Sequence, residues 1–104
     1  MIDKLTNALR ALGATKVKSI KERDCVLLVV EVGNDVFLLS LSKGRFTGSY
    51  VIKLAPSDKV GGWSCIDVEY SPYGLYVLGS EEDEVLGRVI TKFKMLLSAG
   101  PRVT

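Results

Sequence analysis

The sequence contains no histidine among its 104 residues. Without histidine, neither a Ser-His-Asp nor a Cys-His nucleophile can be assembled. The chain also lacks the G-x-S-x-G and H-E-x-x-H motifs that mark common hydrolases. Acid–base chemistry would have to use carboxylates, lysine or tyrosine. We therefore expect a protein that is not an enzyme and that uses no cofactor.

Glutamine is also absent, and asparagine occurs only at Asn7 and Asn34, whereas lysine, arginine, glutamate and valine are plentiful. Depletion of heat-labile amides beside abundant ionic residues is typical of proteins from very hot habitats. Chance variation in a short chain is the alternative explanation. The composition thus favours a thermophilic source, and an archaeal one is compatible with it.

Long apolar runs are missing as well. The longest covers residues 25–30, far short of the roughly 20 residues that span a bilayer. The N-terminal residues lack the basic-then-apolar layout of a signal peptide. We therefore expect a cytoplasmic protein without a membrane partner.

Cysteine is scarce, and the spacing of Cys25 and Cys65 offers no C-x-x-C pair and no third or fourth zinc ligand. We expect no metal site. Both residues fall in predicted strands, where they would be buried apolar thiols. The alternative is a Cys25–Cys65 disulfide, because intracellular proteins of hyperthermophiles are an exception to the reducing rule.

The composition is otherwise that of a globular protein, with 47% hydrophobic and 25% charged residues. A chain of 104 residues can bury a core but is short for two domains. No internal repeat and no composition break is visible. Residues 1–104 should therefore form a single domain.

Both ends of the chain show helical periodicity. Asp3 is placed to cap a first helix that ends near Gly13. Near the other end, Ser80 is a predicted N-cap with Asp83 as its capping-box partner, and Gly100 and Pro101 would stop the helix. The acidic run at residues 81–84 could hold a metal, but helix electrostatics alone explains it.

Between the helices, β-branched and apolar runs alternate with turn residues. We place strands at residues 15–22, 25–32, 36–42, 49–54, 63–71 and 74–79, with a loop at 55–62. The links are too short for parallel crossovers, so neighbouring strands should be antiparallel. The predicted fold class is α+β, with an N-terminal helix, an antiparallel meander of five or six strands, and a C-terminal amphipathic helix.

The strands at 25–32 and 36–42 carry apolar residues on both faces instead of alternating with polar ones. Both faces of the sheet centre therefore need cover. The two helices could lie one on each side, or the sheet could curl around its own residues. Alternatively, both helices share one face, and a partner or a second copy buries the other.

Asp67 and Glu69 lie two apart on the predicted strand at 63–71, so their carboxylates would point the same way. Such a pair could act on a glycosidic bond or bind a divalent cation. The wet face of an edge strand, with Ile66, Val68 and Tyr70 turned inward, produces the same pattern. A carboxylate-based enzyme is therefore the least favoured function.

A basic and aromatic hairpin tip at Lys43, Arg45 and Phe46 could stack on bases or contact phosphates. Further basic residues lie on or near the first strand: Lys16, Lys18, Lys21 and Arg23. Edge-strand lysines also prevent sheets from joining. A net charge of +2 is nearly balanced, which gives nucleic acid little support. Weak nucleic-acid binding is the alternative function.

Aromatic residues concentrate around one predicted hairpin, and we take Trp63, Tyr73 and Tyr76 as candidate binding residues. Tyrosine and tryptophan suit protein interfaces because they bury much area and keep a hydrogen-bonding group. Packing at a sheet end would suit them equally. The leading hypothesis is a non-enzymatic interaction or accessory module, which self-associates or serves a larger archaeal assembly such as a cytoskeletal filament.

Overall fold

The computed structural model describes residues 1–44 and 48–98. Its five strands form one antiparallel sheet in the order β1-β2-β3-β4-β5. The strands are β1 (Lys16–Lys21), β2 (Cys25–Val32), β3 (Asp35–Lys43), β4 (Tyr50–Pro56) and β5 (Leu75–Gly79). The helices are α1 (Ile2–Ala11), the 3-10 turn η1 (Ser57–Lys59), α2 (Cys65–Tyr70) and α3 (Glu82–Ser98). The predicted α+β meander between two terminal helices is confirmed.

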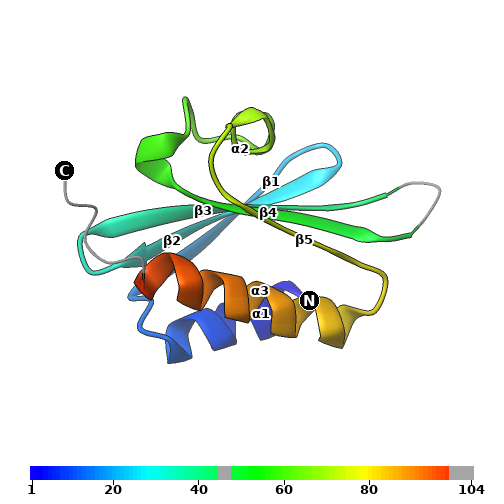
Figure 1. The fold of residues 1–104 in the computed structure, drawn as a ribbon, viewed down its shortest axis with the longest axis horizontal. Coiled ribbons are helices and arrows are strands. Elements are labelled where there is room, and N and C mark those ends of the chain that lie inside the picture. Colours follow the sequence, from blue (N-terminus) through cyan, green and yellow to red (C-terminus); the bar gives the residue numbers. More distant parts are fainter. Residues whose placement is uncertain (45–47, 99–104) are drawn as a thin grey trace.

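The sheet separates two layers of unequal size (Figure 1). α1 and α3 lie side by side on one face, whereas η1 and α2 lie on the other. Both terminal helices therefore share a face. The opposite face is covered by residues 57–74, the connection between β4 and β5, which we call the α2 layer.

The core beneath α1 and α3 is the larger of the two. Phe93 of α3 meets Phe37 of β3 edge to face, with ring centroids 5.3 Å apart. Other fully buried members are Leu5, Leu9, Leu28, Val30, Leu39, Ile52, Leu54, Val85 and Val89. The cross-strand register places the β-strand members of this set on one face.

The smaller core lies beneath the α2 layer. Leu27 and Leu38 are fully buried there and Val29 almost so, packed against Cys65 and Val68 of α2. The sequence predicted that both faces need cover, and both core clusters exist. The cover of this second face comes from within the chain.

The ends of α1 and α3 differ in part from the predicted caps. Gly13 has φ 108°, and the amides of Gly13 and Ala14 donate to the carbonyls of Arg10 and Leu9, a Schellman motif that ends α1 near the predicted residue. Asp3 is not the cap, since α1 begins at Ile2 and Asp3 lies in its first turn. α3 begins at Glu82, one residue too late for Ser80 to be its N-cap. Gly100 and Pro101 lie outside the described residues.

The strand predicted at residues 63–71 is wrong, because this segment forms α2. Ser64 Oγ accepts from the amide of Asp67 at 3.1 Å, the N-cap bond that starts a helix. Cys65 and Val68, three apart, face the sheet and are buried, whereas Ile66 and Tyr70 are exposed. A helical spacing of buried residues thus replaces the alternation predicted for a strand.

Candidate functional site

The two cysteines form a disulfide between the start of β2 and the start of α2, with Cα atoms 6.5 Å apart. The expectation of free buried thiols is therefore wrong, and the alternative of a Cys25–Cys65 bridge holds. Beside it, the carboxylate of Glu22 accepts from the amide of Cys65 at 3.2 Å. The N-terminal end of α2 is thus attached to the sheet covalently and by a hydrogen bond.

Lys53 of β4 holds the other end of α2. Its side chain is only 2% exposed, and Nζ donates to the carbonyl oxygens of Glu69 and Ser71. The ammonium also lies 5.0 Å from the ring centre of Tyr76, whose hydroxyl donates to the Glu69 carbonyl at 3.2 Å. A buried cation is costly unless its donors are satisfied, and the last carbonyls of a helix are well suited to a cation.

Large apolar side chains remain exposed on the outer surface of this region. Among the described residues, seven large hydrophobic side chains are at least half exposed, and six of them belong to the α2 layer or to β5. We call these six the aromatic face: Trp63, Ile66, Tyr70, Tyr73, Tyr76 and Leu78. The seventh is Met95 of α3.

The three candidate residues Trp63, Tyr73 and Tyr76 all belong to the aromatic face. The ammonium of Lys59 lies over the ring of Tyr73, with Nζ 5.3 Å from the ring centre. Sequence reasoning missed Ile66 and Tyr70, because a strand at 63–71 would have turned them inward. A signal for the helix was present, since Ser64 and Asp67 have the spacing of a capping box.

The basic residues are divided between two places. Lys43 is exposed beside the ring of Tyr50, with Nζ 5.1 Å from the ring centre, whereas Arg45 and Phe46 lie outside the described residues. Lys43 also lines a cleft of about 280 Å³ together with Lys21 and Arg23. The lysines of β1 lie on an edge strand.

The paired carboxylates do not exist as a pair. Asp67 and Glu69 lie two apart on α2, and residues at that spacing point to different sides of a helix. Asp67 Oδ2 instead accepts from Ser64 Oγ at 2.7 Å. The geometry that motivated a carboxylate enzyme is therefore absent.

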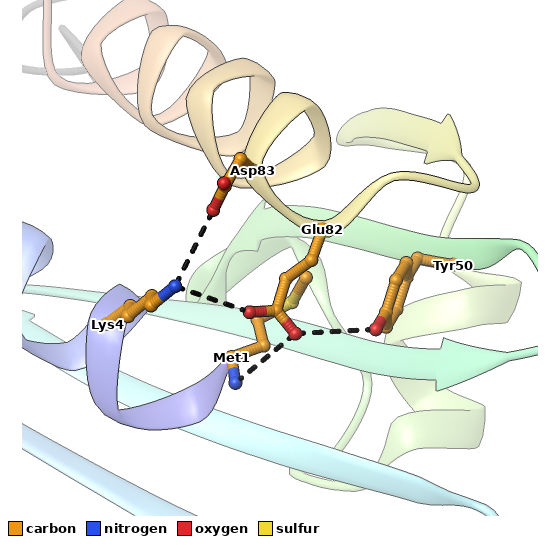
Figure 2. A network of polar contacts seen from close by, with 5 residues as sticks. All are labelled: Met1, Lys4, Tyr50, Glu82 and Asp83. Atoms are coloured by element: carbon orange, nitrogen blue, oxygen red, sulfur yellow. Dashed lines mark hydrogen bonds and ion pairs between the residues drawn. The ribbon is translucent and has the colours of Figure 1, made fainter.

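Glu82 joins three elements on the opposite side of the sheet (Figure 2). Its carboxylate lies 3.7 Å from both the Met1 amino group and Lys4 Nζ of α1, and it accepts from the Tyr50 hydroxyl at 3.5 Å. Asp83 adds a second contact to Lys4 at 3.6 Å. The acidic start of α3 therefore fastens α1 to α3. Across residues 1–44 and 48–98, no group of acidic or cysteine side chains is arranged to hold a metal ion.

Comparison with models of known protein families, with curated proteins and with solved structures found no match. Within the part of the chain that the structure describes, no helix has the length and apolar character needed to cross a membrane. The functional assignment therefore depends on the geometry described above.

Proposed function

We propose that this protein is a non-enzymatic interaction module, which self-associates or serves as an accessory subunit of a larger assembly. The observation that carries the proposal is the aromatic face, where six large apolar side chains gather around the α2 layer and β5. Tyrosine and tryptophan in such a setting are typical of protein interfaces.

The size of this surface supports the proposal. A fully buried aromatic side chain removes about 150–250 Å² from solvent. Because each of the six side chains is at least half exposed, together they present on the order of 600 Å² of surface. The largest apolar patch on a typical monomer measures about 300–600 Å² and is often functional, so the six side chains together expose as much surface as the top of that range. A standard interface buries about 800 Å² per partner, so the aromatic face could supply most of one.

The interface proposed here lies on the outside of the α2 layer and along β5, and not on the sheet face that this layer covers. Leu27, Val29 and Leu38 are already buried by that layer. A partner would therefore meet Trp63, Tyr70 and their neighbours, which are held in place by the disulfide and by Lys53.

Solution mass measured by light scattering over a concentration series tests the proposal. We expect a mass above the 11.3 kDa of one chain that rises with concentration. The chain has a single tryptophan, so Trp63 emission should shift to the blue if association buries this part of the surface. A strict monomer with unchanged emission up to millimolar concentration would count against self-association.

If the partner is a different protein, we propose that this chain is an accessory subunit of an archaeal filament or of a viral assembly. We propose that it acts in the cytoplasm of a thermophile, because intracellular proteins of hyperthermophiles are an exception to the rule that cytoplasmic cysteines stay reduced. In that case the monomer would still bind its partner through the same six residues, and substitution of Trp63 and Tyr73 would abolish the complex.

A weaker second candidate is binding of single-stranded nucleic acid. It is supported by the position of Lys21, Arg23 and Lys43 around one cleft, whose lining also includes Glu22 and Asp24. Affinity for single-stranded DNA should then fall steeply with added salt, because each phosphate contact releases counterions. Salt-independent binding would contradict this candidate.

A further inference from the structure

The two edges of the sheet differ in how they are protected. β1 carries Lys16, Lys18 and Lys21 within six residues, and edge lysines discourage pairing with another strand. β5 at the other edge reads Leu-Tyr-Val-Leu-Gly and contains no charged residue and no proline. An exposed apolar edge of this kind is open to strand addition.

The outward main-chain groups of β5 belong to Tyr76 and Leu78. A strand directs its main-chain groups alternately toward its two sides. The Leu78 carbonyl accepts from Arg88 Nη1 at 3.0 Å, so this carbonyl points away from β4. Val77, between them, is 3% exposed and faces the core under α3, whereas both neighbours are more than half exposed on the opposite face.

We propose that a second copy of this chain adds its own β5 to this edge, antiparallel, about a two-fold axis near Val77. Tyr76 would then lie opposite Leu78 of the partner subunit, and the outward amides and carbonyls of the two residues would bond across the axis. The two sheets would become one continuous sheet. This inference rests on the self-associating form of the proposed function; it names the partner and narrows the interface to the β5 end of the aromatic face.

Arg88 is the group that now occupies this edge. Its bond to the Leu78 carbonyl is exposed to solvent, and Glu84 holds the same guanidinium through Nη2 at 2.7 Å. Because an exposed contact to a carbonyl exchanges readily with water, the arriving strand can replace it. Arg88 stays paired to Glu84 when it does.

Charge on α3 favours a second copy over an unrelated strand. Arg88 reaches the free edge of β5, so its side of α3 would face the partner. A two-fold axis runs the two α3 helices antiparallel. Glu84 of one copy, one turn before Arg88 on that side of α3, would then lie toward Lys92 of the other copy, one turn beyond Arg88.

The apolar contact would be modest. Tyr76 and Leu78 are each about half exposed, as is Met95, which lies two turns beyond Arg88 on the same side of α3. Together they offer on the order of 300 Å² per copy, against about 800 Å² for a standard interface. We therefore expect a reversible dimer that dissociates on dilution.

Sedimentation equilibrium from micromolar to millimolar concentration tests the inference. We expect Leu78→Lys to weaken dimerisation at least tenfold. The new lysine would discourage strand pairing at the β5 edge, as the lysines of β1 do at the other edge. The matched control Ile66→Lys makes the same change on α2 and should leave the dimer intact. Adding Tyr76→Glu to Leu78→Lys should restore dimerisation, since opposite charges would then face each other across the axis.

Amide hydrogen exchange on the unmodified protein gives a second reading that needs no variant. The amides of Tyr76 and Leu78 should become protected as concentration rises, whereas those of Lys18 and its neighbours on β1 should not. A dimer without this protection, or one that Ile66→Lys weakens as much as Leu78→Lys, would overturn the inference and leave the proposed function standing. A monomer at every concentration would overturn both the inference and the self-associating form of the function.

Discussion

Breaking the Cys25–Cys65 bridge should lower the free energy of unfolding by an amount set by the chain that it closes. The two cysteines are 40 residues apart, and the loop between them holds most of β2, all of β3 and β4, and η1. Cross-linking a loop of about 40 residues removes roughly 13 cal/mol/K from the entropy of the unfolded chain, or about 4 kcal/mol at room temperature. This is a large share of the roughly 5–15 kcal/mol that stabilises an ordinary domain.

The native state should nevertheless persist without the bridge. Lys53 and the carboxylate of Glu22 still hold the two ends of α2, and Val68 remains buried beneath it. We therefore expect a folded but weakened protein, with a melting temperature lower by about 20 °C for a domain of this size.

Urea unfolding of the oxidised protein, the reduced protein and the double variant Cys25→Ser/Cys65→Ser measures the effect. The reduced protein and the double variant should share one lowered midpoint, with the urea dependence of the free energy rising somewhat as the unfolded state expands. A loss below about 1 kcal/mol would refute the chain-entropy reasoning. It would mean that the unfolded chain is restrained by something other than the disulfide.

Three further substitutions test the attachment of the α2 layer, each by the shift in urea midpoint. Lys53→Met should cost about 1–3 kcal/mol, because the carbonyls of Glu69 and Ser71 lose a buried donor; an unchanged midpoint would mean that water replaces it. Ser64→Ala should cost about 1 kcal/mol through loss of the α2 cap, and no loss would show that the disulfide alone positions this turn. Gly74→Ala should cost more than about 1 kcal/mol, since its φ is 125° and the added Cβ would lie 2.6 Å from the Leu54 carbonyl, whereas the control Gly61→Ala meets nothing within 4 Å and should be nearly neutral.

Local signals predicted the elements at both ends of the chain and most of the sheet. Strand positions agree to within two residues for all five strands, because β-branched runs and glycine turns act over short distances. The turn at Gly33, with φ 62°, joins β2 and β3 as a tight hairpin needs. Apolar residues on both faces of the central strands indicated that the sheet is covered twice, and both cores exist.

The segment at 63–71 shows where local reasoning fails. Ile66, Val68 and Tyr70 favour a strand by propensity and by alternation. In the fold, Val68 and Cys65 are buried together against β2 and β3, which requires helical spacing. The capping pair Ser64 and Asp67 was the sequence evidence for that outcome, and its weight depends on the sheet surface that the helix covers.

The sequence by itself determined the class of fold and the two amphipathic helices, because hydrophobic periodicity and turn chemistry are properties of neighbouring residues. Only the tertiary structure decided that Cys25 meets Cys65, that Lys53 is buried beneath α2, and that Tyr76 and Leu78 lie on an edge strand of the sheet. Each of these depends on which strands become neighbours and which layer covers them. Such pairings join residues far apart in the chain, so their energies do not appear in any local pattern.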